Sequence, residues 1–368
     1  MDPVRLAVDV GPLLGHRTGI GAAVDALVAT LRACEGVALA PYVLSFRSRP
    51  APPTRRLPLP AAVAHELWSR ADGPRVDRWL GDVEVVHGTN YVVPPSRLPT
   101  VVSVYDCWFL THPARAAPAV RRAGEVLRRR VRAGVTVHAS SHATAAQVRD
   151  VLGATRVEVV HLGPLALPDA SPPVPPSPWA AALVGRPFVL AVGTLERRKD
   201  VPTLVTAFGA IADRHREARL VIAGATGDDA DAVDVAVGAL DPVARRAIVR
   251  PGAVDDATKS WLLHHARALA YPSLDEGFGF PILEAQQVGL PVVATRAGSI
   301  PEVAGDGAEL VAVGDVDALA GALALVLDDD TRRAELIAAG RANVGRFSWP
   351  ATARALVDLY RRLREEGR

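Results

Sequence analysis

Lysine and cysteine are both scarce in this chain of 368 residues. The two cysteines, Cys34 and Cys107, lie far apart and match neither a CxxC pair nor the spacing of a metal site. We expect both to be small buried side chains and not a disulfide. The two lysines, Lys199 and Lys259, stand in a chain that otherwise uses arginine, which suggests that Lys199 supplies a compact point charge.

Long apolar runs are absent as well. No run of about eighteen apolar residues occurs without charges, so we expect no transmembrane helix. The N-terminus leads directly into a predicted strand and lacks the charged leader and apolar core of a signal peptide, so we expect a cytoplasmic protein. A net charge of +2 does not favour a nucleic-acid-binding protein.

Positive charge is nevertheless concentrated in one predicted helix, in which Glu125 is the only acid. Such a helix could contact an anionic membrane surface, which would place the protein at the inner face of the membrane, or an acidic acceptor. The alternative is an ordinary solvated helix face in an arginine-rich protein. The arginines concerned are Arg121, Arg122, Arg128, Arg129, Arg130 and Arg132.

The length of the chain predicts two domains, and the order of its patterns predicts their class. Apolar strands alternate with helical patterns throughout, as in βαβ units with parallel sheets, so we predict an α/β fold. The strands are predicted at residues 5–10, 83–87, 100–105, 134–139 and 156–161, and then at 188–192, 219–223, 247–250, 268–271, 291–295 and 309–311.

A proline-rich stretch separates the two series of strands. Residues 166–180 are predicted to form a stiff, extended linker between an N-terminal domain, residues 1–165, and a C-terminal domain, residues 181–346. The last segment, residues 347–368, is predicted to be helical. One helical stripe there carries Leu356, Leu359, Tyr360 and Leu363.

The segment from Glu276 to Glu284, EGFGFPILE, has the most specific pattern in the chain. It places two carboxylates eight positions apart across a glycine-rich turn, with Pro281 suited to the first position of a helix. The start of a helix attracts an anion, and each carboxylate can accept hydrogen bonds from hydroxyl groups. The pattern therefore predicts a diphosphate between two polyols. The alternative is that Glu276 only complements the helix dipole and Glu284 lies on a solvated face.

Here the chain resembles the retaining GT-B glycosyltransferases of family 4. The carboxylate pair has their E-x7-E spacing, residues 250–303 are similar to their nucleotide-binding half, and residues 188–199 are similar to their diphosphate loop. The resemblance implies two Rossmann-like domains that face a central cleft. It also implies a C-terminal helix that crosses back to the N-terminal domain.

The resemblance implies roles for residues of the C-terminal domain. Arg198 and Lys199 would bind the donor diphosphate, Glu276 would hold the donor sugar, and Glu284 would bind the ribose. The base would lie near Val254 and contact the main chain. Further donor contacts would come from the backbone of Gly193, Gly277, Phe278 and Gly279.

Fewer residues are implied in the N-terminal domain. Gly19 and Gly21 precede a predicted helix and suit a loop that approaches phosphate, but they do not match the dinucleotide fingerprint. Family members carry His-Asp where this chain has Tyr105 and Asp106, which we assign to the catalytic site; Asp106 is either a sugar ligand or a helix cap.

The stretch HGTNY contributes two more candidates. His87 and Asn90 are candidate acceptor ligands, although a lone histidine after a strand is often structural.

The sequence therefore predicts a retaining hexosyltransferase that takes a nucleotide-diphosphate sugar, GDP-mannose first and a UDP-hexose second. The acceptor would be a hydroxyl of a glycan, a lipid-linked sugar or a small molecule. No cofactor and no metal are expected, because the acidic clusters are typical of turns and helix caps. The alternatives are a nucleotide-sugar epimerase or hydrolase with this fold, and a catalytically weak sugar-nucleotide-binding protein.

Overall fold

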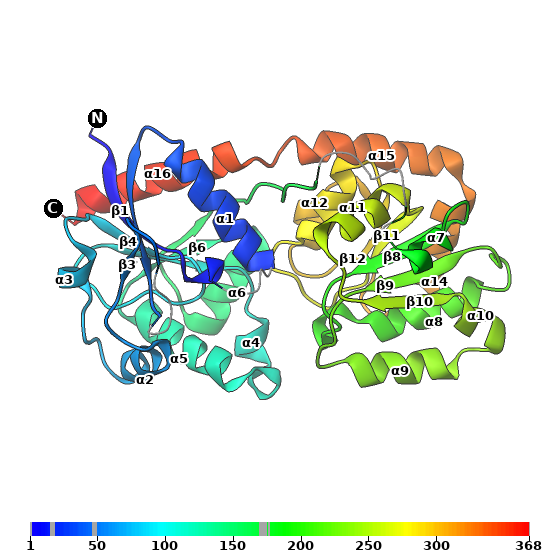
Figure 1. Ribbon diagram of the computed structural model, residues 1–368, viewed down its shortest axis with the longest axis horizontal. Helices are drawn as coiled ribbons and strands as arrows, with labels where there is room; N and C mark the ends of the chain where they lie inside the picture. The colour runs from blue at the N-terminus through cyan, green and yellow to red at the C-terminus, as the bar shows by residue number, and fades with distance from the viewer. Residues whose placement is uncertain (1, 15–18, 46–49, 169–174, 176, 368) are drawn as a thin grey trace. The chain divides into compact units, whose positions relative to one another are not determined.

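The computed structural model describes residues 2–14, 19–45, 50–168, 175 and 177–367. The chain folds as two compact units: unit 1 comprises Met1–Gly163 and Phe347–Arg368, and unit 2 comprises Pro164–Arg346. Each unit has one parallel sheet between layers of helices (Figure 1). Among the described residues, no helix has both the length and the apolar character needed to span a bilayer.

The sheet of unit 1 has the described strands in the order β3-β2-β1-β4-β5-β6-β7. The chain proceeds from β1 to β3 on one side and returns to β4 on the other, so the strand order switches direction between β1 and β4. The strands are β1 Val4–Asp9, β2 Val37–Val43, β3 Arg55–Arg56, β4 Val85–Gly88, β5 Thr100–Val104, β6 Thr136–Ala139 and β7 Val157–Val159. The helices are η1 Gly11–Leu13, α1 Gly19–Arg32, α2 Ala61–Arg70, α3 Asp77–Leu80, α4 Trp108–Thr111, η2 Pro113–Arg115, α5 Pro118–Arg132, α6 His142–Leu152 and α16 Trp349–Glu366.

The sheet of unit 2 has the order β10-β9-β8-β11-β12-β13 and switches direction between β8 and β11. In open α/β sheets, ligands bind beyond the carboxyl ends of the strands at such a switch. The strands are β8 Phe188–Val192, β9 Arg219–Ala223, β10 Ile248–Gly252, β11 Ala268–Tyr271, β12 Val292–Thr295 and β13 Ala308–Val311. The helices are α7 Pro178–Ala181, η3 Arg197–Lys199, α8 Val201–Ile211, α9 Ala230–Ala239, α10 Pro242–Arg246, α11 Asp256–His265, α12 Phe280–Gln287, α13 Ile300–Ala304, α14 Val316–Asp328 and α15 Asp330–Val344.

The predicted α/β fold is confirmed, and every predicted strand overlaps a strand of the structure. The sequence patterns missed β2 and β3. Pro41 interrupts the apolar pattern of β2, and β3 consists of two exposed arginines at the edge of the sheet. Such segments carry no core-facing alternation from which a strand could be predicted.

The predicted proline-rich linker needs one correction. Residues 169–174 and 176 lie outside the described residues, but residues 178–181 form the short helix α7 and are not extended. The Ser177 hydroxyl accepts a hydrogen bond from the amide of Ala180, and Pro178 occupies the first helical position. Serine followed by proline is a helix-start signal that outweighs the general proline content.

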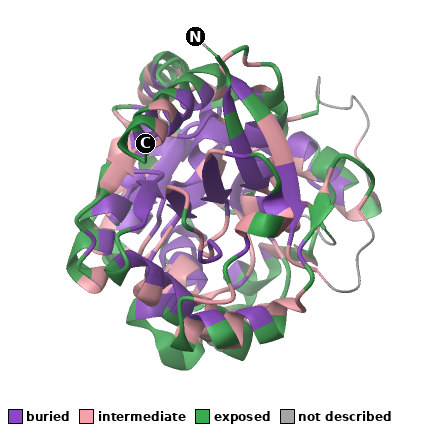
Figure 2. Cartoon of the chain, turned by 90° about the vertical axis from the view of Figure 1, so that its left-hand side faces the viewer, coloured by how far each residue is buried: buried purple, intermediate pink, exposed green. Residues whose placement is uncertain are grey.

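Two apolar layers enclose the sheet of unit 1, whose strands are largely buried (Figure 2). Helices α1 and α16 pack side by side on one face, while α2 and α5 cover the other. The predicted stripe Leu356, Leu359, Tyr360 and Leu363 is buried, as expected. The last helix of the chain therefore belongs to the core of unit 1.

A chain of buried hydrogen bonds also joins α16 to this sheet. The His138 Nε2 lies 3.0 Å from the carbonyl of Val160, which can only accept, so Nε2 carries the proton and donates. Burial lowers the pKa of His138 to about 4, so the ring is neutral. Its Nδ1 therefore accepts from the Ser103 hydroxyl at 2.8 Å.

The donor and acceptor roles of the next hydrogen bonds, which lead to Tyr360 of α16, are assigned in the same way. With its proton donated to His138, the Ser103 oxygen accepts from the Nε2 of His87 at 2.8 Å. Burial, more than the neighbouring His138, lowers the pKa of His87 to about 3, so its Nδ1 accepts from the Tyr360 hydroxyl at 2.7 Å. Each hydrogen bond of this series thus has one fixed direction, and every ring nitrogen and hydroxyl in it has a partner.

Two buried tyrosines of unit 1 provide a matched test of this chain. We expect Tyr360→Phe to destabilise unit 1 by about 1–3 kcal/mol, because it leaves the buried Nδ1 of His87 without a donor. The Tyr42 hydroxyl, in contrast, is buried without a hydrogen-bond partner among the described residues, so Tyr42→Phe should be neutral or stabilising. Calorimetric melting of both variants checks this, and equal losses of stability would contradict it.

Candidate active site

Two loops at the switch point of unit 2 bring together most of the residues predicted to bind the donor. The first follows β8 and contains Gly193, Arg198 and Lys199; the second follows β11 and leads through Glu276 into α12. The two strands are neighbours in the sheet, so both loops start at the same edge. A small hollow there is lined by Gly193, Lys199 and Tyr271, among others.

The Glu276 carboxylate occupies the centre of these loops. It is only 6% exposed, and its Oε2 lies 2.6 Å from Arg198 while its Oε1 lies 2.5 Å from Lys199. Oε1 also accepts a hydrogen bond from the Ser273 hydroxyl at 2.8 Å. Burial alone would raise the pKa of this carboxyl, but Arg198 and Lys199 outweigh it and hold the pKa at about 2. Glu276 is therefore ionised at neutral pH.

The two cations have further contacts in the same loops. The Lys199 ammonium donates to the Tyr271 hydroxyl at 2.7 Å and lies 4.4 Å from the centre of that ring. Burial lowers the pKa of Lys199, whereas the charge of Glu276 opposes this change. The Arg198 guanidinium donates to the carbonyl of Asp275 at 3.3 Å. The loops after β8 and β11 are thus joined mainly by charge-assisted bonds.

Glycine backbone geometry shapes the start of α12. Gly279 has a φ of +97° and precedes the first helical residue, Phe280. Pro281 therefore occupies the second helical position, whereas the sequence predicts the first. At Gly298, a Cβ atom would lie 2.3 Å from the carbonyl oxygen of Glu276, so only glycine fits behind the loop.

Three further residues of unit 2 that we predict to bind the donor are Phe278, Gly277 and Val254. Phe278 is 4% exposed and its ring meets that of Phe280 at 5.1 Å, while its carbonyl accepts from the Ser299 hydroxyl at 3.0 Å. Gly277 is buried. Val254 is partly buried and lies two residues before α11. The structure describes these positions, and their donor contacts stay predictions.

Glu284 is buried, which argues against the alternative that it lies on a solvated helix face. It is 1% exposed in α12, and its Oε1 lies 2.5 Å from the Lys259 ammonium on α11. Its Oε2 is buried and has no hydrogen-bond partner among the described residues. Sequence reasoning missed Lys259. The available signal was that lysine occurs at only two positions, and both pair with the glutamates of the motif.

The acidic clusters of unit 2 include helix caps, as predicted. Asp255 accepts from the amide of Thr258 at the start of α11, and Asp329 accepts from the amide of Arg332 at the start of α15.

In unit 1, Tyr105 and Asp106 use their polar atoms within the chain. Tyr105 is 7% exposed and donates its hydroxyl to the carbonyl of Thr89 at 2.9 Å. Asp106 accepts from the amide of Trp108 and from the Tyr91 hydroxyl, each at 3.1 Å. The capping alternative for Asp106 therefore has a direct contact in its favour, and the single proton of Tyr105 is already donated.

The acceptor role predicted for His87 is wrong. The side chain is fully buried, and both ring nitrogens are hydrogen-bonded inside unit 1. The histidine is structural, which was the stated alternative. Asn90 lies beyond the end of β4 and is partly exposed, while its Oδ1 has no partner among the described residues. A contact between Asn90 and the acceptor stays a prediction.

The glycines near the N-terminus also lie differently from the prediction. Gly19 and Gly21 belong to the first turn of α1 and not to a loop before it. Sequence reasoning missed Asp9, which ends β1 at the switch point of unit 1. Burial raises its pKa to about 6, against the hydrogen bond that its Oδ1 accepts from the amide of Gly11 at 2.8 Å.

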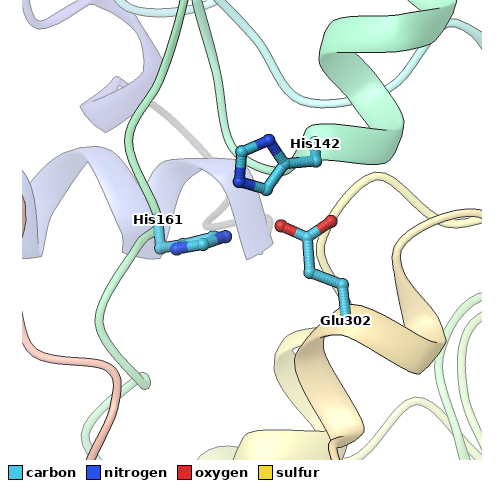
Figure 3. Close-up of side chains that lie close together, drawn as sticks. All are labelled: His142, His161 and Glu302. Atoms are coloured by element: carbon cyan, nitrogen blue, oxygen red, sulfur yellow. The ribbon is translucent and has the colours of Figure 1, made fainter.

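Two further histidines lie together in unit 1. The rings of His142, which begins α6, and His161, which follows β7, meet edge to face at 5.8 Å (Figure 3). The His161 ring also meets that of Phe347 at 5.6 Å, next to α16. The third residue labelled in the picture, Glu302, belongs to α13 of unit 2.

The arginine-rich helix α5 uses part of its charge inside unit 1. Arg122 lies 2.9 Å from Glu66 of α2, and Arg130 lies 3.0 Å from Asp72. Arg129 lies near the same aspartate, at 3.5 Å. These pairs join α5 to α2 and the residues after it, and contact with a membrane surface stays a prediction.

Curated proteins match parts of this chain. O-antigen chain mannosyltransferase B of Escherichia coli is 34% identical over 178 residues, which cover 48% of this chain and 46% of that protein. A D-inositol 3-phosphate glycosyltransferase of Xylanimonas cellulosilytica is 34% identical over 221 residues, or 56% of this chain and 51% of that protein. The chain spans about half the length of the curated relatives it matches.

Among solved structures, sucrose-phosphate synthase from Thermosynechococcus elongatus is similar to the whole chain. The TM-score is 0.73 at 20% identity, and the match covers 98% of this chain and 99% of that one. This likeness concerns the fold alone, and the two parallel-sheet units are those of the GT-B fold that the resemblance implies. Residues 180–343 match the model of the family described as Glycosyl transferases group 1. This matched segment makes up most of unit 2.

Proposed function

We propose that the protein is a retaining glycosyltransferase of family 4, which moves a hexose from a nucleotide-diphosphate sugar to an acceptor hydroxyl. The acceptor is a glycan, a lipid-linked sugar or a small molecule. One observation carries the proposal: Arg198, Lys199 and the ionised Glu276 meet where β8 and β11 end, beside the start of α12.

The chemistry needs positive charge at this place. When the anomeric carbon separates from the diphosphate, negative charge grows on the leaving oxygen, and fixed cations lower the energy of that state. Arg198 has five N–H donors and Lys199 has three. The contacts of Lys199 are with Glu276 and Tyr271, so among the described residues two of its three donors are engaged and the third can face a phosphate oxygen.

Glu276 holds and orients the donor in this proposal and does not transfer a proton. A carboxylate with a pKa of about 2 is a weak proton acceptor at neutral pH. In the retaining reaction, the acceptor oxygen forms its bond to the anomeric carbon on the face from which the diphosphate leaves. The departing phosphate oxygen takes the acceptor proton. No group of the protein is then required as a general base.

GDP-mannose is the first proposed donor and a UDP-hexose the second. The loop Gly193-Thr-Leu-Glu-x-Arg-Lys resembles that of mannosyltransferases, and a mannosyltransferase is among the relatives. We propose that transfer requires no metal. The capping contacts of Asp255 and Asp329 support this, because both side chains have a structural use.

A donor screen tests the proposed activity against its alternatives. We expect GDP-mannose or a UDP-hexose to raise the melting temperature through binding, and we expect sugar transfer when acceptors are added. Donor turnover without any acceptor would favour the epimerase or hydrolase. Binding without turnover under every acceptor would favour the sugar-nucleotide-binding protein, and no binding of any nucleotide sugar would contradict the proposal.

Lys199→Ala should reduce kcat/KM by about 100-fold or more, because it removes a cation from the leaving diphosphate. Arg197→Ala is the matched control. Arg197 lies in the same turn but is 48% exposed and pairs with Asp229 at 3.6 Å, outside the contacts of Glu276. Transfer assays and melting temperatures of both variants check the prediction. Equal activities of the two variants would contradict it.

A further inference from the structure

The Lys259–Glu284 pair contains an arrangement that a purely structural ion pair does not need. Glu284 is 1% exposed, and an isolated carboxylate at that depth would be strongly destabilising. Lys259 supplies the counter-charge at 2.5 Å, but only to Oε1. The other oxygen, Oε2, is buried without a partner among the described residues. Buried acceptors are nearly always satisfied, so this exception needs an explanation.

The type of cation accounts for the free oxygen. Arginine is the default cation in this chain, and its planar fork can pair with both oxygens of a carboxylate at once. Lysine carries a point charge that can engage a single oxygen. A lysine at position 259 therefore neutralises Glu284 and still leaves Oε2 with an unused acceptor site.

We propose that Lys259 is a positioning and specificity-determining residue, which holds Oε1 of Glu284 so that Oε2 accepts a hydrogen bond from a ribose hydroxyl. This inference rests on the proposed function, since it assumes that a sugar nucleotide binds at the ends of β8 and β11. It commits to a ribonucleotide with its vicinal diol. Because Oε2 is buried, the proposal requires the side chains that cover it to move aside when the ribose binds.

The inference is tested by calorimetry with GDP and UDP and with their 2′,3′-dideoxy forms. We expect the wild-type protein to bind one ribonucleotide about tenfold or more tightly than its dideoxy form, which is the size of a charge-assisted hydrogen bond. In Lys259→Arg the charge is kept, but the guanidinium fork should occupy both oxygens of Glu284. The ratio should then fall close to one while the melting temperature stays within a few degrees of the wild-type value.

A matched control is Arg267→Lys. Arg267 pairs with Asp330 at 2.6 Å in the same unit, at the opposite end of β11 from the candidate site. We expect this variant to keep both the affinities and the ratio. Lys259→Met should also lose the ratio, and in addition it should melt at a lower temperature, because the buried carboxylate loses its counter-charge.

Three outcomes overturn the inference. If Lys259→Arg keeps the wild-type ratio, the lysine is only a structural counter-ion. If the wild-type protein binds ribonucleotides and dideoxynucleotides equally, Glu284 does not read the ribose, although the proposed function stands. If the wild-type protein binds neither GDP nor UDP in any form, the proposed function fails together with the inference.

Discussion

The buried carboxylate of Glu276 is the constraint on which the candidate site depends. An ionised carboxylate at 6% exposure requires compensating charges, and it has two, from Arg198 and Lys199. Both cations come from the loop after β8, while the acid comes from the loop after β11. The electrostatic requirement of one side chain therefore fixes the two loops against each other at the switch point of the sheet. Among the described residues, Lys199 contacts Glu276 and Tyr271 and keeps a third donor that an anionic ligand could use.

The buried hydrogen bonds between α16 and the sheet of unit 1 are made by neutral groups instead. The chain from Tyr360 through His87, Ser103 and His138 contains no charge, because burial lowers the pKa of both histidines far below neutral pH. It serves to fix α16 on the sheet. The described carboxyl ends of β1 and β5 carry acids, Asp9 and Asp106, where unit 2 carries cations. Under the proposed function, an anionic donor in unit 2 and a hydroxyl-bearing acceptor in unit 1 match this difference.

The sequence led to correct predictions for features that depend on local pattern. It failed for features that depend on side-chain orientation or on contacts between residues far apart in the chain. Apolar runs located the core strands, and glycine and proline located the start of α12 to within one residue. The same local reading could not show that His87 points into the core, since its partner Tyr360 lies 273 residues away. It could not find Lys259 either, because the distance between Lys259 and Glu284 is set by the packing of α11 and α12. The scarcity of lysine in the composition was a signal, but only the contact with Glu284 in the structure shows why Lys259 matters.

The placement of the two lysines follows from how a cation shares a carboxylate. At Glu276, each oxygen has its own cation, Lys199 on Oε1 and Arg198 on Oε2. At Glu284, one oxygen has a lysine and the other has no partner among the described residues. An arginine in either lysine position would offer a planar fork and compete for the second oxygen of the same acid. In a chain that elsewhere uses arginine, each of the two lysines therefore contacts one oxygen of a buried carboxylate and leaves the second oxygen to another partner. The two glutamates therefore differ at the second oxygen. In Glu276 that oxygen is paired with Arg198, whereas in Glu284 it can still accept a hydrogen bond from a ligand hydroxyl.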